Sequence, residues 1–250
     1  MRLTRVHVGA ALSGGDTLEL PDAAGAHLVR VLRLGVGAAL AVFDGRGNEF
    51  AAVIARVRGT RVDVQLQDRR AGAAESGLVL TLLQSISRAE RMDWTIQKAT
   101  ELGVARIVPL KTEYTIVRLD AAGAEKKRQH WMSVAASACE QCGRAVVPAI
   151  DTPLTLPDYI AAQRAADPAD AGLKLVLDPE SGTGLRTLSE PVGAATLLVG
   201  PEGGLSDAEL KLATGHGFTA VRLGPRVLRT ETAAVAALAA LQALHGDLAE

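Results

Sequence analysis

The chain has 250 residues, of which 48% are hydrophobic and 22% charged, and its formal net charge at pH 7 is −1. Such a composition is typical of a globular protein whose core is large enough to fold without disulfide bridges or a structural metal. No apolar run reaches the ~18–20 residues that span a bilayer, the N-terminus lacks the apolar stretch of a signal peptide, and two cysteines are too few for a secreted disulfide framework. We therefore expect a cytoplasmic protein with no membrane partner.

Positive charge is concentrated at the N-terminus. Residues 1–70 contain ten arginines and seven acidic residues, whereas acidic residues are in excess over the rest of the chain. Arginine suits phosphate because its planar guanidinium donates two parallel hydrogen bonds. This distribution permits an RNA partner, although the net positive charge of residues 1–70 is small compared with that of a strongly basic RNA-binding domain.

The N-terminal region, residues 1–70, is predicted to be a small β-barrel. It contains short runs in which apolar and polar residues alternate or β-branched residues are frequent, and turn residues separate these runs. The predicted strands are Leu3–Val8, Ala39–Phe43, Glu49–Val57 and Thr60–Gln67. One helix is expected between the first two strands, over Ala23–Leu34. Residues 71–77 are small and polar, and we interpret them as a linker.

Residues 78–250 alternate between strand and helix patterns. The predicted strands are Leu78–Leu83, Val104–Leu110, Leu173–Leu177, Thr196–Val199 and Ala220–Leu223, and the predicted helices include Arg88–Leu102, Glu125–Cys142 and Thr232–His245. This order predicts a mainly parallel sheet covered on both faces. The last helix is apolar nearly all round, so we expect it to be buried in the core or against a second subunit.

A glycine-rich loop, Gly200-Pro201-Glu202-Gly203-Gly204, follows one buried strand, and Ser206 with Glu209 then forms the pattern of a capping box. Loops at the carboxyl ends of parallel strands bind ligands, but an ordinary tight turn before a helix fits the spacing equally well. The loop lacks the Lys-Ser/Thr of a P-loop, and the segment 182–187 lacks the third glycine of a dinucleotide fingerprint. The pattern favours a ligand that is not held by its phosphates.

A second loop, Leu223–Arg229, precedes the apolar last helix. Thr230 is expected to cap this helix, and Glu231 suits its positive N-terminus. Arg226 and Arg229 do not suit that position, because cations are disfavoured near helix N-termini. Their placement indicates an anionic partner.

These segments together resemble the SPOUT methyltransferases, and most closely the RsmE family of small-subunit ribosomal RNA uridine-N3 methyltransferases. The resemblance rests on the Gly200–Gly204 loop followed by Leu223-Gly224-x-Arg226-x-Leu228-Arg229-x-Glu231-Thr232-Ala233, and three further segments match: His27–Arg33 with Phe43–Gly45, Gln97–Val104 and Ala138–Arg144. It extends over nearly the whole chain. The chain departs from many relatives at Ala26-His27, where they have a His pair, and at Arg88, where they have lysine.

The resemblance implies an α/β protein with a PUA-like N-terminal β-barrel and a SPOUT domain that contains a trefoil knot. It also implies a homodimer that uses S-adenosyl-L-methionine (SAM) to methylate N3 of a specific uridine in 16S ribosomal RNA of the small ribosomal subunit. The cofactor-binding residues so implied are Leu198, Gly200, Gly203, Gly204, Leu223, Gly224, Leu228 and Thr232. No metal is expected.

For the chemistry, Arg229 is expected to stabilise the uracil anion or to hold the flanking phosphate, and Glu202 or Glu231 is the expected proton acceptor. Arg5, Arg30, Arg33 and Arg88 are expected to hold the RNA. Two alternatives stay open: a SPOUT enzyme that methylates ribose 2′-oxygens, and a non-catalytic RNA-binding assembly factor. Cys139 and Cys142 are interpreted as buried structural thiols, since zinc needs four ligands and no second pair is spaced to supply them.

Overall fold

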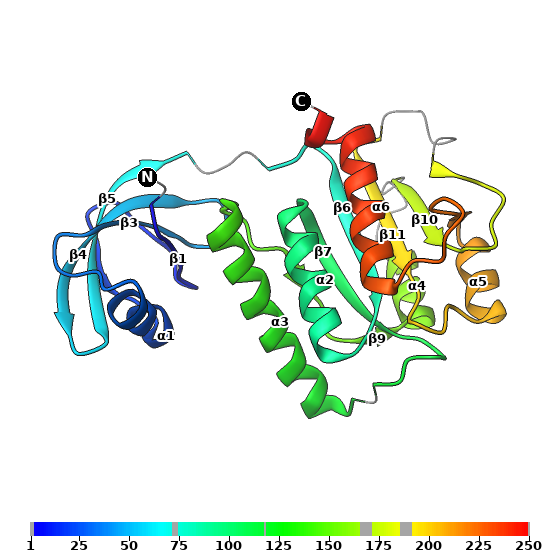
Figure 1. Ribbon diagram of the computed structural model, residues 1–250, viewed down its shortest axis with the longest axis horizontal. Helices are drawn as coiled ribbons and strands as arrows, with labels where there is room; N and C mark the ends of the chain where they lie inside the picture. Colours follow the sequence, from blue (N-terminus) through cyan, green and yellow to red (C-terminus); the bar gives the residue numbers. More distant parts are fainter. Residues whose placement is uncertain (1–2, 72–74, 118, 166–171, 186–191, 250) are drawn as a thin grey trace. The chain divides into compact units, whose positions relative to one another are not determined.

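The computed structural model describes residues 3–71, 75–117, 119–165, 172–185 and 192–249. It divides the chain into two compact units (Figure 1). The first unit comprises Met1–Glu75 together with Ala136–Val147, and the second comprises Ser76–Ala135 together with Pro148–Glu250. Within the described ranges, the helices are all too short or too polar to cross a membrane.

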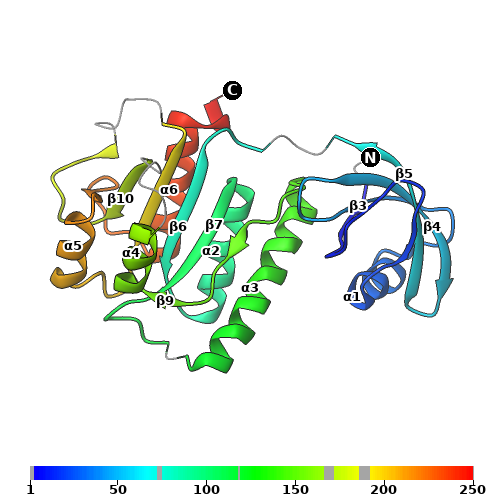
Figure 2. The same cartoon turned by 180° about the vertical axis from the view of Figure 1, so that it is seen from behind.

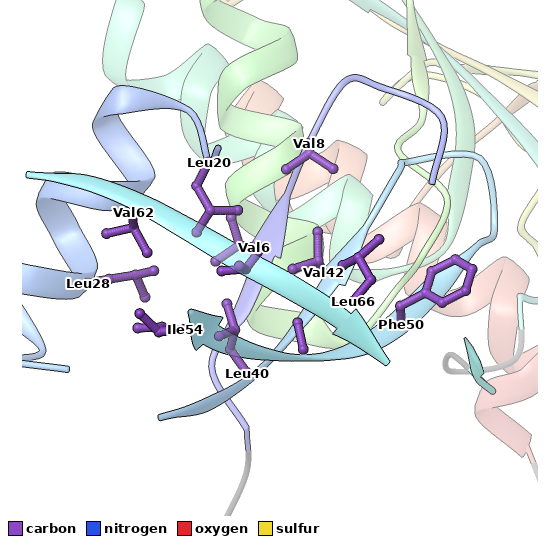
Figure 3. Packing of buried hydrophobic residues seen from close by; sticks show 12 residues of the cluster. Val6, Val8, Leu20, Leu28, Leu40, Val42, Phe50, Ile54, Val62 and Leu66 are labelled. Atoms are coloured by element: carbon purple, nitrogen blue, oxygen red, sulfur yellow. The ribbon is translucent and has the colours of Figure 1, made fainter. Parts of the chain in front are cut away.

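The first unit is built on a five-stranded sheet with the order β1-β3-β4-β5-β2. The strands are β1 (Arg5–His7), β2 (Thr17–Glu19), β3 (Ala39–Phe43), β4 (Glu49–Arg58) and β5 (Arg61–Arg70). β1 runs parallel to β3 and the other pairs are antiparallel. Alternate residues of β4 and β5 face inward, and with Leu40 and Leu28 they form one apolar core (Figure 3). The predicted strands of this region are confirmed to within a few residues.

The helix of this unit is shorter than the sequence predicts. An α-helical turn, α1 (Asp22–Ala26), is followed by a π-helical turn over His27–Val31, so the helix ends before Leu34. Leu28 lies in the core, but Val31 is 64% exposed. The wider π turn shifts the register of the side chains, which is why Leu28 and Val31 do not share one buried stripe as a regular α-helix would place them.

The second unit is built on a seven-stranded parallel sheet with the order β12-β10-β11-β6-β7-β8, and β9 also pairs with β7. The strands are β6 (Val79–Ser85), β7 (Val104–Lys111), β8 (Ala149–Ile150), β9 (Leu154–Thr155), β10 (Leu173–Leu177), β11 (Ala194–Val199) and β12 (Thr219–Val221). The parallel sheet predicted from the alternation of elements is therefore confirmed.

Helices cover both faces of this sheet (Figures 1 and 2). They are α2 (Ala89–Glu101), α3 (Ala121–Cys142), α4 (Leu156–Ala165), α5 (Asp207–Thr214) and α6 (Thr230–His245). Residues of α4 and α5 pack on Leu83, Val176 and Leu198, whereas α2 and α6 contact each other and the sheet. Because neighbouring strand residues point to opposite faces, the continuous apolar runs of β6 and β11 supply both layers.

One buried side chain, Gln242 of α6, fastens the end of that helix to two other elements. Its amide Nε2 donates to the carbonyl of Leu102, at the end of α2, at 2.8 Å. Its Oε1 accepts from Ser76 Oγ, just before β6, at 2.8 Å. Gln242 is fully buried, so these bonds have no water to replace them.

The Gln242→Leu variant is expected to lose about 2–4 kcal/mol of unfolding free energy, because the Leu102 carbonyl and the Ser76 hydroxyl lose their partner in a buried place. Urea unfolding followed by circular dichroism measures the loss. Gln97→Leu, the same replacement at an exposed position of α2, is the control, with an expected change of less than about 0.5 kcal/mol. Equal midpoints for the two variants would contradict the assigned role.

Candidate active site

The connections of the sheet reverse direction between β6 and β11. The chain leaves β6 through α2 toward β7 on one side, and it leaves β11 through α5 toward β12 on the other. Ligands bind at such switch points, in the crevice beyond the carboxyl ends of the strands. The loop after β11 is Gly200–Ser206, which is the glycine-rich motif of the sequence, and the loop after β6 is Ile86–Arg88.

Glycine is required at two positions of the loop after β11. Gly204 has a φ of +77°, and a Cβ on Gly200 would lie 3.1 Å from the backbone of Gly204 and Leu205. The predicted capping box is confirmed, because Ser206 Oγ accepts from the amide of Glu209 and the Glu209 carboxylate accepts from the amide of Ser206. The capping box fixes the end of the loop at α5, and Gly203 and Gly204 are exposed.

The second loop, between β12 and α6, also turns at a glycine, with Gly224 at a φ of +69°. Pro225 and Arg226 are exposed, and Leu223 and Leu228 are half-buried. Arg229 is the N-cap residue of α6 and makes no side-chain capping bond. The expectation that Thr230 caps this helix is wrong, because Thr230 is already the first helical residue.

The hydroxyl of Thr230 instead joins the two loops. It donates to the carbonyl of Gly200 at 2.6 Å and accepts from Gln84 Nε2 at 3.0 Å. Thr230 is 5% exposed and Gln84 is fully buried. A hydrogen-bonded chain therefore runs from the end of β6 through the start of α6 to the end of β11, and it fixes the spacing of the two loops.

Sequence reasoning missed Gln84. The signal that could have found it is a large polar side chain next to Leu82 and Leu83 in a strand predicted to be buried, because a buried amide needs hydrogen-bond partners.

A pocket of about 390 Å³ opens beside the N-terminus of α6. It is lined by Glu90, Arg91 and Trp94 of α2 and by Arg229, Glu231 and Thr232 of α6. Arg229 is exposed there, and among the described residues its guanidinium has no hydrogen-bond or ion-pair partner. The N-terminus of α6 and Arg229 supply positive potential on the α6 side of the pocket, and the carboxylates of Glu90 and Glu231 supply negative charge in the same lining.

The two candidate proton acceptors meet at one arginine. Arg91 Nη1 donates to Glu202 Oε1 at 2.8 Å, and Arg91 Nε lies 3.8 Å from Glu231 Oε1. The second oxygen of Glu231, Oε2, is buried and has no partner within the described part of the chain. Sequence reasoning missed Arg91, although its place one turn after Arg88 on the helix that follows β6 could have indicated it.

The remaining predicted site residues are divided between several places. Leu198 is fully buried and packs in the core beneath α4 and α5, so only its main chain is available to a ligand. Arg88 is the exposed N-cap residue of α2 and lines a different pocket from Arg229. Arg30 is exposed on the π turn of the first unit, and Arg33, two residues after that turn, is also exposed and has a φ of +55°.

Arg5 does not fit the role expected of it. Its side chain is 7% exposed, and its guanidinium is bound to the Glu49 carboxylate and to the carbonyls of Cys139 and Arg144. It also lies over the ring of Phe43, 4.5 Å from the centroid. All three nitrogens of its guanidinium thus donate inside the first unit, and Arg5 is a structural residue rather than a contact for RNA phosphate.

The two cysteines differ in their surroundings. Cys139 is buried, as expected, but Cys142 is half-buried. The Cys139 thiol donates to the carbonyl of Val146 at 3.5 Å. Interaction with the neighbouring Cys139 thiol lowers the pKa of Cys142 to about 6, and interaction with Cys142 together with burial raises the pKa of Cys139.

Comparison with known proteins places this fold in one class. Residues 74–242 match the family model of an RNA methyltransferase domain, and residues 20–67 match that of an RNA methyltransferase PUA domain. The chain thus has the predicted PUA-like domain and a parallel-sheet α/β RNA methyltransferase domain.

Similar proteins indicate which family of RNA methyltransferases the chain belongs to. Ribosomal RNA small subunit methyltransferase E of Buchnera aphidicola (Schizaphis graminum) is 32% identical over 99% of this chain and 98% of its own length. A SAM-bound methyltransferase structure from Legionella pneumophila is 42% identical, with a TM-score of 0.91 over 99% of this chain and 100% of that one. The SAM-bound methyltransferase E of Neisseria gonorrhoeae is 38% identical, with a TM-score of 0.88 over 99% and 100%. This chain belongs to the ribosomal RNA small subunit methyltransferase E family.

Proposed function

We propose that this protein transfers a methyl group from SAM to N3 of a uridine in 16S ribosomal RNA, at the 1498-type position, and that it acts on the assembled small subunit. The observation that carries the proposal is the pair of glycine loops fastened together by Thr230, next to a pocket that contains Arg229 and Glu231. Support comes from the family and from the SAM held by its relatives in Legionella and Neisseria.

The two loops suit SAM better than a nucleotide phosphate. Gly203, Gly204 and Gly224 are exposed, so their main chain is open to a ligand except for the Gly204 amide, which donates to the Pro201 carbonyl at 3.0 Å. Main-chain groups of this kind hydrogen-bond an adenine edge and a ribose. Neither loop carries the Lys-Ser/Thr of a phosphate-binding loop. We expect Gly200–Gly204 and Leu223–Leu228 to hold the cofactor, with Thr232 at the edge of the neighbouring pocket. SAM supplies a methyl group already activated by its sulfonium.

The protein then has to remove the N3 proton of uracil and stabilise the resulting anion. Glu231 is the better placed acceptor, because it lines the pocket and its Oε2 has no partner in the described structure. Arg91 faces both carboxylates, but it hydrogen-bonds Glu202 at 2.8 Å and lies 3.8 Å from Oε1 of Glu231. The proton passes from N3 to Glu231, and negative charge spreads over N3 and the uracil carbonyl oxygens. Arg229, across the same pocket, neutralises that charge. The target base must leave its stack to reach these groups.

The wider assembly is proposed on the same grounds. Arg30 and Arg33 of the barrel and Arg88 of α2 are exposed cations that would bind RNA phosphate. We also propose the homodimer and the trefoil knot that the family resemblance implies, and a cytoplasmic location, where ribosomal subunits are found.

The test is methyl transfer from labelled SAM to small subunits that lack the modification, with the product nucleoside identified by mass spectrometry. N3-methyluridine is expected, and subunits that already carry the mark should accept no label. A 2′-O-methyl product would show a different SPOUT reaction. Failure to bind SAM would indicate a non-catalytic RNA-binding factor instead.

A further inference from the structure

One of the two tryptophans, Trp94 of α2, lies at the surface of the second unit. It is 40% exposed, whereas Trp131 of α3 is 1% exposed. Aromatic side chains are scarce in this protein, which has two tryptophans, two tyrosines and three phenylalanines. A buried tryptophan supplies more apolar surface to a core than almost any other side chain. Trp131 is used in that way, and the exposed indole of Trp94 needs a different explanation.

Trp94 forms part of the wall of the proposed active site. It lines the pocket of about 390 Å³ in which Arg229 lies, and among the described residues of that lining it is the one aromatic side chain. Trp94 comes four positions after Glu90 and three after Arg91, so these three side chains share one face of α2. The opposite face of the helix, which includes Met92, is buried in the core. The exposed indole therefore belongs to the face of α2 that is turned to this pocket.

The faces of the Trp94 indole are available to a ligand. Within the part of the chain that the structure describes, no aromatic ring and no cation stacks on it. The guanidinium of Arg229 is also exposed in the same pocket. Flat aromatic and guanidinium groups are the side chains on which proteins stack unpaired RNA bases.

The charges of the lining favour a neutral ligand. Arg91 and Arg229 carry two positive charges and Glu90 and Glu231 two negative ones, so the formal charges of the described lining cancel. A free phosphate group would be repelled by the two carboxylates. A pyrimidine base is neutral and flat, and its carbonyl oxygens accept hydrogen bonds from a guanidinium. The volume lies within the ~300–1,000 Å³ of pockets that bind small ligands.

We propose that Trp94 is the platform on which the target uracil stacks after it has left its place in the RNA. This inference rests on the proposed function, and it makes Trp94 a substrate-binding residue with no part in proton transfer. A base that unstacks from its neighbours loses stacking energy, and an aromatic side chain replaces that energy. Because the ring is stacked both before and in the transition state, its loss raises KM and leaves kcat near wild type.

Two variants of Trp94 test the stacking contact. Trp94→Leu keeps an apolar side chain without a ring, and it is expected to raise KM for small subunits about 5- to 20-fold, the range for one stacked base. The kcat and the Kd of SAM should stay within about twofold of wild type. Trp94→Phe keeps a smaller ring and should hold KM within about threefold of wild type. A folded leucine variant with wild-type KM would overturn the proposal.

The matched control is Met132→Ala. Met132 is an apolar side chain of α3 with nearly the same exposure, 41%, and it lies outside the pocket of Arg229. Its removal should leave KM, kcat and the Kd of SAM unchanged. An equal rise of KM in the Met132→Ala and Trp94→Leu variants would show a general effect of surface changes and would overturn the proposal.

Direct binding provides a readout that does not depend on methyl transfer. Filter binding of small subunits in the presence of S-adenosylhomocysteine is expected to give a Kd about 5- to 20-fold weaker for Trp94→Leu than for wild type. If the wild-type protein transferred no methyl group, the proposed function would fail, and these Kd values would still decide the role of Trp94. Sedimentation equilibrium of both proteins tests a contact between two copies of the chain. Loss of self-association in the leucine variant with unchanged subunit affinity would assign Trp94 to that contact and overturn the proposal.

Discussion

The Arg229→Ala variant is expected to lose about 10²- to 10³-fold in kcat, the scale seen when one group that stabilises a developing anion is removed. Arg229 lines the same pocket as Glu231, and its guanidinium is uncommitted among the described contacts, so it is available to the uracil anion. The Kd of SAM should stay within about twofold of wild type, because the role of Arg229 is confined to the base. Single-turnover methyl transfer to small subunits, with calorimetric titration of SAM, gives both quantities.

The matched control is Arg226→Ala. Arg226 is an exposed arginine of the same loop, but it does not line the pocket of Glu231. Its loss should leave kcat near wild type and affect at most the KM for RNA, as expected of a phosphate contact. If the two variants had equal kcat values, the assignment of Arg229 would be wrong.

The Thr230→Val variant is expected to weaken SAM binding by at least tenfold and to lower the unfolding free energy by about 2–4 kcal/mol. Valine has nearly the shape of threonine, but it leaves the Gly200 carbonyl and the Gln84 amide without their shared partner. The cofactor loops then lose the bond that fixes their spacing. Calorimetric titration with SAM and urea unfolding measure the two effects.

The Thr230→Ser variant keeps the hydroxyl and removes the methyl group, so it distinguishes the effect of the hydrogen bonds from that of packing. Serine keeps both hydrogen bonds, so SAM affinity should return to within about threefold of wild type, while some packing energy is lost. Wild-type SAM affinity in the valine variant would show that the loops hold their spacing without Thr230.

Much of the scaffold could be predicted because it depends on local patterns. The apolar run of β6 and the buried stripe of Met92, Ile96 and Ala99 on α2 indicate their elements directly, and Ser206 with Glu209 forms the capping box as expected. The helix after Asp22 was predicted less well, because periodicity does not distinguish a π turn from an α turn.

The contacts of the site could not be predicted, since they join residues far apart in the sequence. Threonine is a residue type common at helix N-caps, so the sequence suggests that role for Thr230. Only the fold shows that its hydroxyl donates to the carbonyl of Gly200, thirty residues away. Arg91 and Glu202 are likewise paired across 111 residues. For Arg5 the sequence suggested a contact that the structure does not support. A cation near the N-terminus was expected to bind RNA, but its guanidinium donates to the Glu49 carboxylate.

The first unit is completed by a segment from the middle of the chain. Ala136–Val147 supplies carbonyls to Arg5, and Arg144 of that segment forms an ion pair with Glu75 at 2.7 Å. During synthesis the ribosome must therefore release nearly 150 residues before the barrel can close all its polar contacts. A fragment cut after Glu75 would leave the guanidinium of Arg5 without two of its acceptors, so we expect such a fragment to be less stable than the same residues in the whole chain.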